Sequence, residues 1–83
     1  MTEDQKYLAE ILSQCRYAPG TSSKRFAATL GYMAKENKPL SEKQLKYMYQ
    51  IACTKRNQIG QKAFDMIPRE IWIEYKKQHK SIK

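Results

Sequence analysis

The fold is decided by the stretch Leu40-Ser41-Glu42-Lys43-Gln44-Leu45-Lys46-Tyr47-Met48-Tyr49-Gln50-Ile51-Ala52-Cys53. Ser41 and Gln44 have the spacing of a capping box, in which each side chain bonds the backbone N–H of the other residue. Leu40 before the cap and Leu45 after it have the spacing of a hydrophobic staple. One face of a helical wheel is apolar and holds Leu45, Met48, Tyr49, Ala52 and Cys53. We therefore expect an amphipathic helix here.

The opposite face of this helix carries side chains of the kinds that contact nucleic acid. Lysine binds phosphate, glutamine and asparagine pair with adenine, and tyrosine stacks or donates a hydrogen bond. An ordinary solvated helix face has the same composition, and this alternative stays open. The polar face consists of Lys43, Lys46, Tyr47, Gln50, Thr54 and Asn57.

Outward from this stretch, the pattern predicts three further helices. Thr2 and Gln5 repeat the capping-box spacing at the start of the first. Pro19-Gly20 separates the first from the second, because the residue before proline disfavours helix and glycine tolerates positive φ. Pro68 suits the first position of the last. The four predicted helices span residues 3–16, 22–36, 41–57 and 68–79.

These elements predict an all-α fold, a compact bundle of about four short helices. We expect one domain over residues 1–83, with residues 80–83 frayed. Gly31 falls inside the second helix, where its lack of a side chain allows another helix to approach closely. The expected core consists of Leu8, Ile11, Leu12, Phe26, Leu30, Met33, Leu45, Met48, Ala52, Phe64, Ile67, Ile71 and Trp72.

Positive charge dominates the chain. Sixteen Lys and Arg stand against eight Asp and Glu, which gives a net charge of +8. Ten basic and two acidic residues lie between Ile11 and Phe64. A folded basic face suggests a polyanionic partner, most often nucleic acid, and charge that serves only solubility is the alternative. The candidate contacts are Lys24, Arg25, Lys43, Lys46, Tyr47, Gln50, Lys55 and Arg56.

Six tyrosines and one tryptophan are many for 83 residues. Interleaved with Lys and Arg, they could stack on unpaired bases. Tyrosine also suits the rim of a thin core, since it has an apolar body and a polar tip. We expect Tyr7, Tyr49 and Trp72 in or near the core, and Tyr32 and Tyr47 exposed.

Two segments resemble small helical accessory proteins of phage and bacterial DNA metabolism. They are Phe26-Ala27-Ala28-Thr29-Leu30 and Leu40-Ser41-Glu42-Lys43-Gln44-Leu45-Lys46-Tyr47-Met48. In such proteins an F-x-x-x-L helix is followed by L-S-x-K-Q. The resemblance covers about a third of the chain and implies a role on nucleic acid or on a nucleic-acid machine. It implies no catalytic residue.

The chemistry of an enzyme or a metal site is poorly represented. His79 is the one histidine, and it lies among lysines without an orienting carboxylate. Cys15 and Cys53 occupy helical apolar positions, where buried thiols are expected. Two separated cysteines and one distant histidine do not make a zinc site, and the three glycines form no phosphate loop. We expect no catalysis, no metal and no cofactor.

The sequence also bears on membranes. No stretch approaches the roughly 18 apolar residues of a membrane-spanning helix, and the acidic start Met1-Thr2-Glu3-Asp4 is unlike a targeting segment. The last predicted helix has the composition of an interfacial helix, but a domain this small needs Trp72 in its core. We expect a cytoplasmic protein without membrane contact.

The sequence is compatible with two functions. The first is a basic, non-enzymatic nucleic-acid-binding accessory protein that holds DNA or RNA phosphates. The alternative is a protein-interaction module, a phage-type inhibitor or adaptor that docks on the acidic surface of a nucleic-acid-processing or defence complex. Apolar anchors at Tyr32, Tyr47 or Ile51 would mark this alternative, because such contacts survive high salt. The sequence leaves the kind of nucleic acid and the oligomeric state open.

Overall fold

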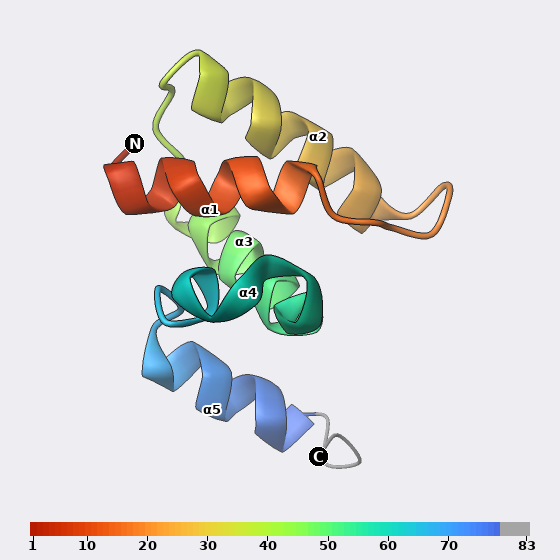
Figure 1. Cartoon of the computed structure of the whole chain (residues 1–83), viewed down its shortest axis with the longest axis vertical. Helices are drawn as coiled ribbons and strands as arrows, with labels where there is room; N and C mark the ends of the chain where they lie inside the picture. The colour runs from red at the N-terminus through yellow and green to blue at the C-terminus, as the bar shows by residue number, and fades with distance from the viewer. Residues whose placement is uncertain (79–83) are drawn as a thin grey trace.

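The computed structural model describes residues 1–78, and the regular elements in this part of the chain are all α-helices (Figure 1). The predicted all-α class is confirmed, but residues 1–78 hold five helices rather than about four. The predicted fraying of residues 80–83 lies outside the described residues. The helices are α1 (Glu3–Ser13), α2 (Ser22–Lys35), α3 (Glu42–Thr54), α4 (Arg56–Phe64) and α5 (Arg69–Gln78).

α1 and α2 pack against each other, with α2 turning back along α1 (Figure 1). The predicted close contact at Gly31 is confirmed, because a Cβ added there would lie 2.9 Å from Cβ of Ser13. α1 ends at Ser13, earlier than predicted. The reason is that two side chains help to satisfy its last carbonyls. The Tyr17 hydroxyl donates to Leu12 O at 2.6 Å, and the Ser13 hydroxyl donates to Glu10 O at 2.6 Å.

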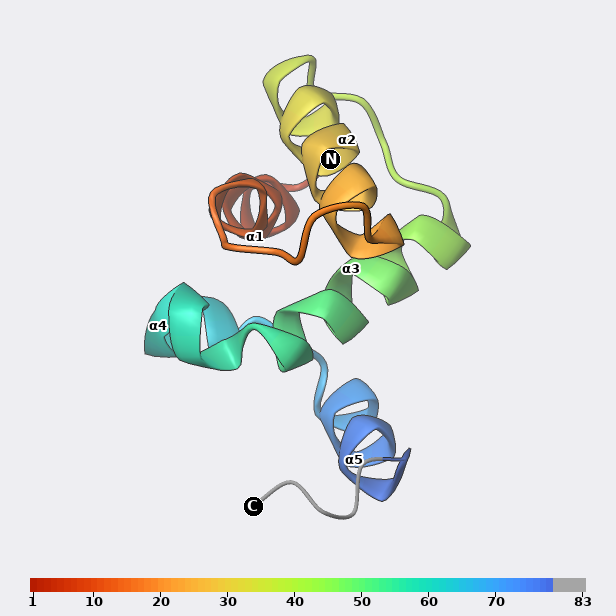
Figure 2. The same cartoon turned by 90° about the vertical axis from the view of Figure 1, so that its right-hand side faces the viewer.

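α3 is the central helix and contacts each of the other four (Figure 2). The predicted capping box is present at its start. The Ser41 hydroxyl accepts from the Gln44 backbone N–H at 3.2 Å, and the Gln44 side-chain oxygen accepts from the Ser41 N–H at 3.0 Å. This reciprocal cap satisfies two otherwise unpaired donors and fixes where α3 begins.

The predicted helix over residues 41–57 is wrong at its end. α3 stops at Thr54, and α4 begins at Arg56 after a break at Lys55. The Arg56 guanidinium donates to Cys53 O at 2.9 Å, so a side chain replaces the missing helical bond. α4 is itself interrupted by Gly60, whose φ of 83° lies in the left-handed region that favours glycine.

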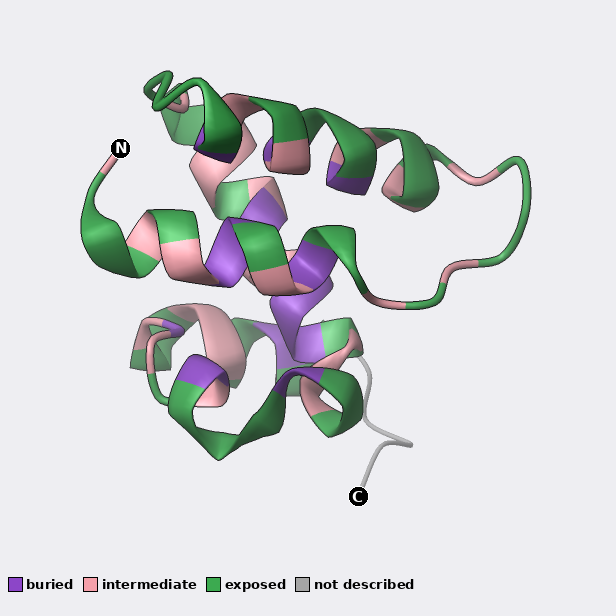
Figure 3. Ribbon diagram, turned by 45° about the horizontal axis from the view of Figure 1, so that its top comes forward, coloured by how far each residue is buried: buried purple, intermediate pink, exposed green. Residues whose placement is uncertain are grey.

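The core runs through the middle of the molecule, where α1, α3 and α4 meet (Figure 3). Its largest fully buried side chains are Leu8, Leu12, Leu30, Met48 and Cys53. Of the predicted core, Leu8, Leu12, Leu30, Met48, Ala52 and Ile67 are buried, whereas Ile11, Phe26, Met33, Leu45, Phe64, Ile71 and Trp72 are half-buried. Five short helices enclose little volume, so much of the apolar surface stays at the rim.

Two residues are more buried than expected. Ile51, considered as an anchor for a protein partner, is only 4% exposed, because α3 contacts four other helices and buries a wider arc than its apolar stripe. Ile59 of α4 is buried although it was not expected in the core.

None of the helices within residues 1–78 is both long and apolar enough to cross a bilayer.

Candidate functional site

The exposed stripe of α3 keeps part of the predicted polar face together. Lys43, Lys46 and Thr54 are exposed, and Gln50 is half-buried. Asn57 leaves the stripe because it lies on α4, beyond the break. The stripe therefore offers two free ammonium groups at its start and amide and hydroxyl groups further along.

Tyr47 closes the stripe on the side of α2. Its ring centroid lies 4.6 Å from that of Phe26, and its hydroxyl lies 3.3 Å from the Ser22 hydroxyl. The expectation that Tyr47 is exposed is wrong, since Phe26 covers one face of the ring and leaves the residue half-buried. Tyr32, by contrast, is 53% exposed as expected. Tyr47 is thus a fixed aromatic edge of the site.

The start of α2 supplies the next two candidate contacts. Lys24 and Arg25 are exposed and adjoin Ser22, Ser23 and Phe26, which lie against α3. No acidic residue stands in the first turn of α2. The charges of Lys24 and Arg25 add to the positive end of the helix dipole, and no carboxylate in this turn neutralises them. The positive potential there attracts an external anion.

Lys55 and Arg56 lie elsewhere, at the junction between α3 and α4. Lys55 Nζ sits 4.7 Å from the centroid of the Tyr17 ring, and the Arg56 guanidinium 5.4 Å from the Trp72 ring. Both are half-buried. These cation–π contacts and the bond to Cys53 O give the two residues a packing role that competes with binding phosphate.

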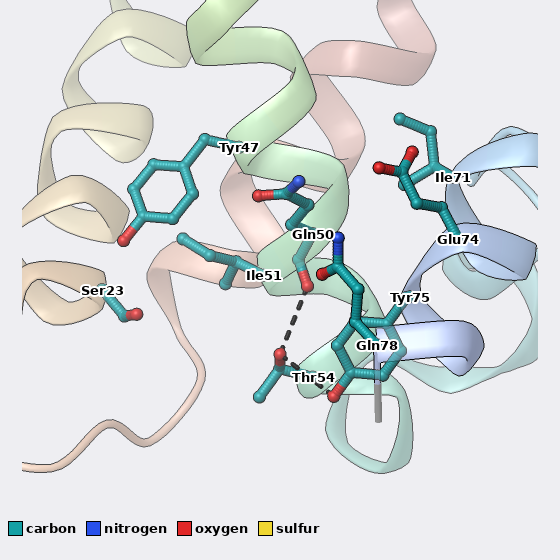
Figure 4. A pocket seen from close by; sticks show the side chains of 9 residues that line it. All are labelled: Ser23, Tyr47, Gln50, Ile51, Thr54, Ile71, Glu74, Tyr75 and Gln78. Carbon is teal, nitrogen blue, oxygen red and sulfur yellow. Dashed lines mark hydrogen bonds between the residues drawn. The ribbon is translucent and has the colours of Figure 1, made fainter. Parts of the chain in front are cut away.

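A cavity of about 200 Å³ lies at the C-terminal half of the α3 stripe (Figure 4). α3 supplies Tyr47, Gln50, Ile51 and Thr54, and α2 supplies Ser23. The opposite wall comes from α5 and consists of Ile71, Glu74, Tyr75 and Gln78. Three helices distant in sequence thus bring hydroxyl, amide, carboxylate and apolar groups to one hollow.

Hydrogen bonds fix some of these groups and leave others available. The Thr54 hydroxyl lies 3.3 Å from Gln50 O and 3.4 Å from the Tyr75 hydroxyl. Within residues 1–78, the Gln50 amide and the Glu74 carboxylate have no hydrogen-bond partner. Figure 4 shows the Glu74 carboxylate turned from α5 towards α3, and the Gln50 amide over α3 with its oxygen on the side of Tyr47. They are free to bind a ligand.

Sequence reasoning missed the wall formed by α5. Glu74 and Gln78 are spaced i, i+4, which indicated that they share a helix face but not that this face meets α3. On α2, Thr21 is the N-cap, and Ser23 lies inside the helix and lines the cavity.

The cysteine thiols are poor nucleophiles at neutral pH. Burial raises the pKa of the Cys53 thiol to about 11, although the nearby Arg56 charge partly offsets this. Burial also raises the pKa of Cys15, which is half-buried rather than buried. Among residues 1–78, no group of three His, Cys, Asp or Glu residues could hold a metal ion.

No protein-family model, curated protein or solved structure matches this chain. The site is therefore interpreted from its own geometry.

Proposed function

We propose that this chain is a small, non-enzymatic nucleic-acid-binding accessory protein that acts in the cytoplasm and holds phosphates through Lys24, Arg25, Lys43 and Lys46. The observation that supports it best is that these four cations are all exposed and belong to α2 and α3, two of the three helices that wall one cavity. Lys55 and Arg56, also candidates, are left out because their charges already lie against Tyr17 and Trp72.

The uneven distribution of charge between helices supports the same proposal. α2 carries three cations, Lys24, Arg25 and Lys35, and no carboxylate. α1 carries Glu3, Asp4 and Glu10 against a single lysine, Lys6. The positive charge is therefore concentrated on α2 rather than spread evenly between the two packed helices. A polyanion approaching the protein would be oriented towards α2 and α3.

Fluorescence anisotropy with labelled single- and double-stranded oligonucleotides at about 50 mM salt tests this proposal. Lys43→Glu/Lys46→Glu should weaken binding by at least about tenfold, since two phosphate contacts become repulsions. The matched control is Lys6→Glu/Lys62→Glu, which changes the net charge equally on the side where Lys62 lies over Tyr7. Equal losses in both variants, or no binding by the wild type, would overturn the proposal.

A protein-interaction module remains the second candidate because of an apolar groove between α3 and α5. It is lined by Leu45, Tyr49, Pro68 and Ile71, with charged residues at its rim. A pull-down from host lysate with and without nuclease separates the two functions. A partner that survives nuclease and high salt would favour the groove over the basic surface.

A further inference from the structure

We propose that the cavity between α3, α5 and the first turn of α2 receives one unpaired nucleobase of a single strand. This inference rests on the proposed function, and it adds what the site recognises: a base that carries an exocyclic amino group. The flanking cations would hold the phosphates on either side of that base.

The size of the cavity sets the first limit on the ligand. Its volume is about 200 Å³, below the roughly 300 Å³ at which sites for drug-sized ligands start. One planar ring system fits this space, whereas a base pair is too large. The cavity therefore suits a base that has left its stack.

The chemistry of the lining sets the second limit. Glu74 places a carboxylate in the cavity, which disfavours a phosphate but accepts a hydrogen bond from an amino group. The Gln50 amide can both donate to and accept from the edge of a base. The apolar part of the lining includes the half-buried Ile71, on which a ring face can lie. Cytosine and adenine present an amino donor to Glu74, and thymine does not.

The charges around the cavity match a nucleotide as a whole. Inside the cavity, the one acidic side chain is Glu74. Outside it, Arg25, Lys43 and Lys46 are exposed on α2 and α3, two of the three helices that form its walls. A neutral, amino-bearing base with an anionic backbone is complementary to this arrangement, because each part meets the charge that attracts it.

The position of α3 argues against a duplex as the ligand. α3 contacts all four other helices, and Gln50 and Thr54 of its stripe line a hollow whose other walls come from α2 and α5 (Figure 4). A recognition helix must project to enter a major groove. Groups that line a hollow between helices can reach instead the edge of a base that is not paired.

The test compares oligo-dC, oligo-dT and a dC·dG duplex of equal length by anisotropy at about 50 mM salt. We expect dC to bind at least about fivefold more tightly than dT and than the duplex. Glu74→Ala should bring the dC:dT ratio towards one without weakening dT binding, since it removes a negative charge from the surface. The matched control is Glu70→Ala, one turn earlier on α5 and outside the cavity, which should leave the ratio unchanged. Thermal unfolding verifies that each variant is folded.

The outcomes separate this inference from the proposed function. If the three oligonucleotides bind equally, and Lys43→Glu/Lys46→Glu weakens all of them, the base site is overturned and the phosphate surface stands. If no oligonucleotide binds, both proposals fall. A nuclease-resistant protein partner that is lost with Glu74→Ala would also overturn the base site, because the carboxylate would then receive a cationic side chain.

Discussion

Gly31 of α2 lies directly against Ser13 at the end of α1, so closely that a Cβ on Gly31 would be 2.9 Å from Ser13 Cβ and 3.2 Å from its Oγ. The obstructing atom is the Cβ of Ser13, which is fixed to the backbone and cannot rotate away. The distance between the two helices is therefore set by the absence of a side chain at this position.

Gly31→Ala should destabilise the protein, although alanine is the better helix former. The added methyl group forces α1 and α2 apart, and overpacking of this kind costs about 1–3 kcal/mol. The gain from helix propensity offsets at most about 1 kcal/mol. Urea unfolding monitored by circular dichroism measures the difference.

The control for this prediction is a double-mutant cycle with Ser13→Gly. Removing the Ser13 side chain makes room, so the double variant should recover most of what Gly31→Ala loses. If the changes in unfolding free energy of the two single variants simply add in the double variant, the two side chains do not clash.

Ser41→Ala should lower the free energy of unfolding by about 1 kcal/mol, because the N–H of Gln44 loses its acceptor at the start of α3. Ser41→Asp keeps an acceptor at the same place and should remain close to the wild type. Equal stability of the alanine and aspartate variants would mean that the cap does not hold α3.

Arg56→Lys tests the packing role given to Arg56. Lysine keeps the charge but loses the planar guanidinium that lies over Trp72 and donates to Cys53 O. We expect a loss of about 1 kcal/mol in unfolding free energy with unchanged oligonucleotide affinity. Weaker nucleic-acid binding at unchanged stability would contradict this and would show that Arg56 contacts nucleic acid.

Cys53 should make the protein less stable at alkaline pH. Its thiol pKa rises from 9.0 to about 11 on folding, so the fold favours the neutral thiol. This contribution is complete below pH 9 and is lost as the pH rises towards 11. Urea unfolding at pH 8 and pH 10 should show a smaller drop for Cys53→Ala than for the wild type.

Thiol labelling at pH 8 provides the independent readout. Cys53 is fully buried and Cys15 is half-buried, so Cys15 should react first and Cys53 only as fast as the chain unfolds. Equal labelling rates of the two thiols, mapped by mass spectrometry, would contradict the burial of Cys53.

Binding of oligonucleotides should depend steeply on salt. Each phosphate contact releases about one counterion, so the slope of log affinity against log salt should fall by roughly two in Lys43→Ala/Lys46→Ala. Anisotropy titrations between about 50 and 200 mM salt measure this slope. An unchanged slope would mean that neither lysine contacts phosphate.

The parts of the fold that the sequence predicted are those with a local cause. The capping boxes at Thr2 and Ser41 mark helix starts through contacts three residues apart, and both are present. The close approach at Gly31 was visible because glycine inside a helix needs a packing reason. The end of α3 was missed, because Arg56, which caps it, is also a good helix former.

The candidate site was predictable only in its α3 half. Lys43, Lys46 and Gln50 share a helix face, which spacing alone indicates. The sequence around Glu74 does not indicate that this residue lines the cavity beside α3, because its position depends on how α5 packs against α3. The half-burial of Tyr47 likewise results from the approach of Phe26 on another helix. Long-range packing is not encoded in periodicity.

The central position of α3 also determines how the whole chain would report on a ligand. Because each of the other four helices contacts α3, loss of α3 removes contacts from all of them, and we expect a domain of this size to unfold in one cooperative transition. A molecule held on α3 stabilises only the intact fold, by roughly 2.7 kcal/mol at a hundredfold excess over its Kd. A rise in melting temperature would therefore reveal occupancy of the hollow without any labelled probe.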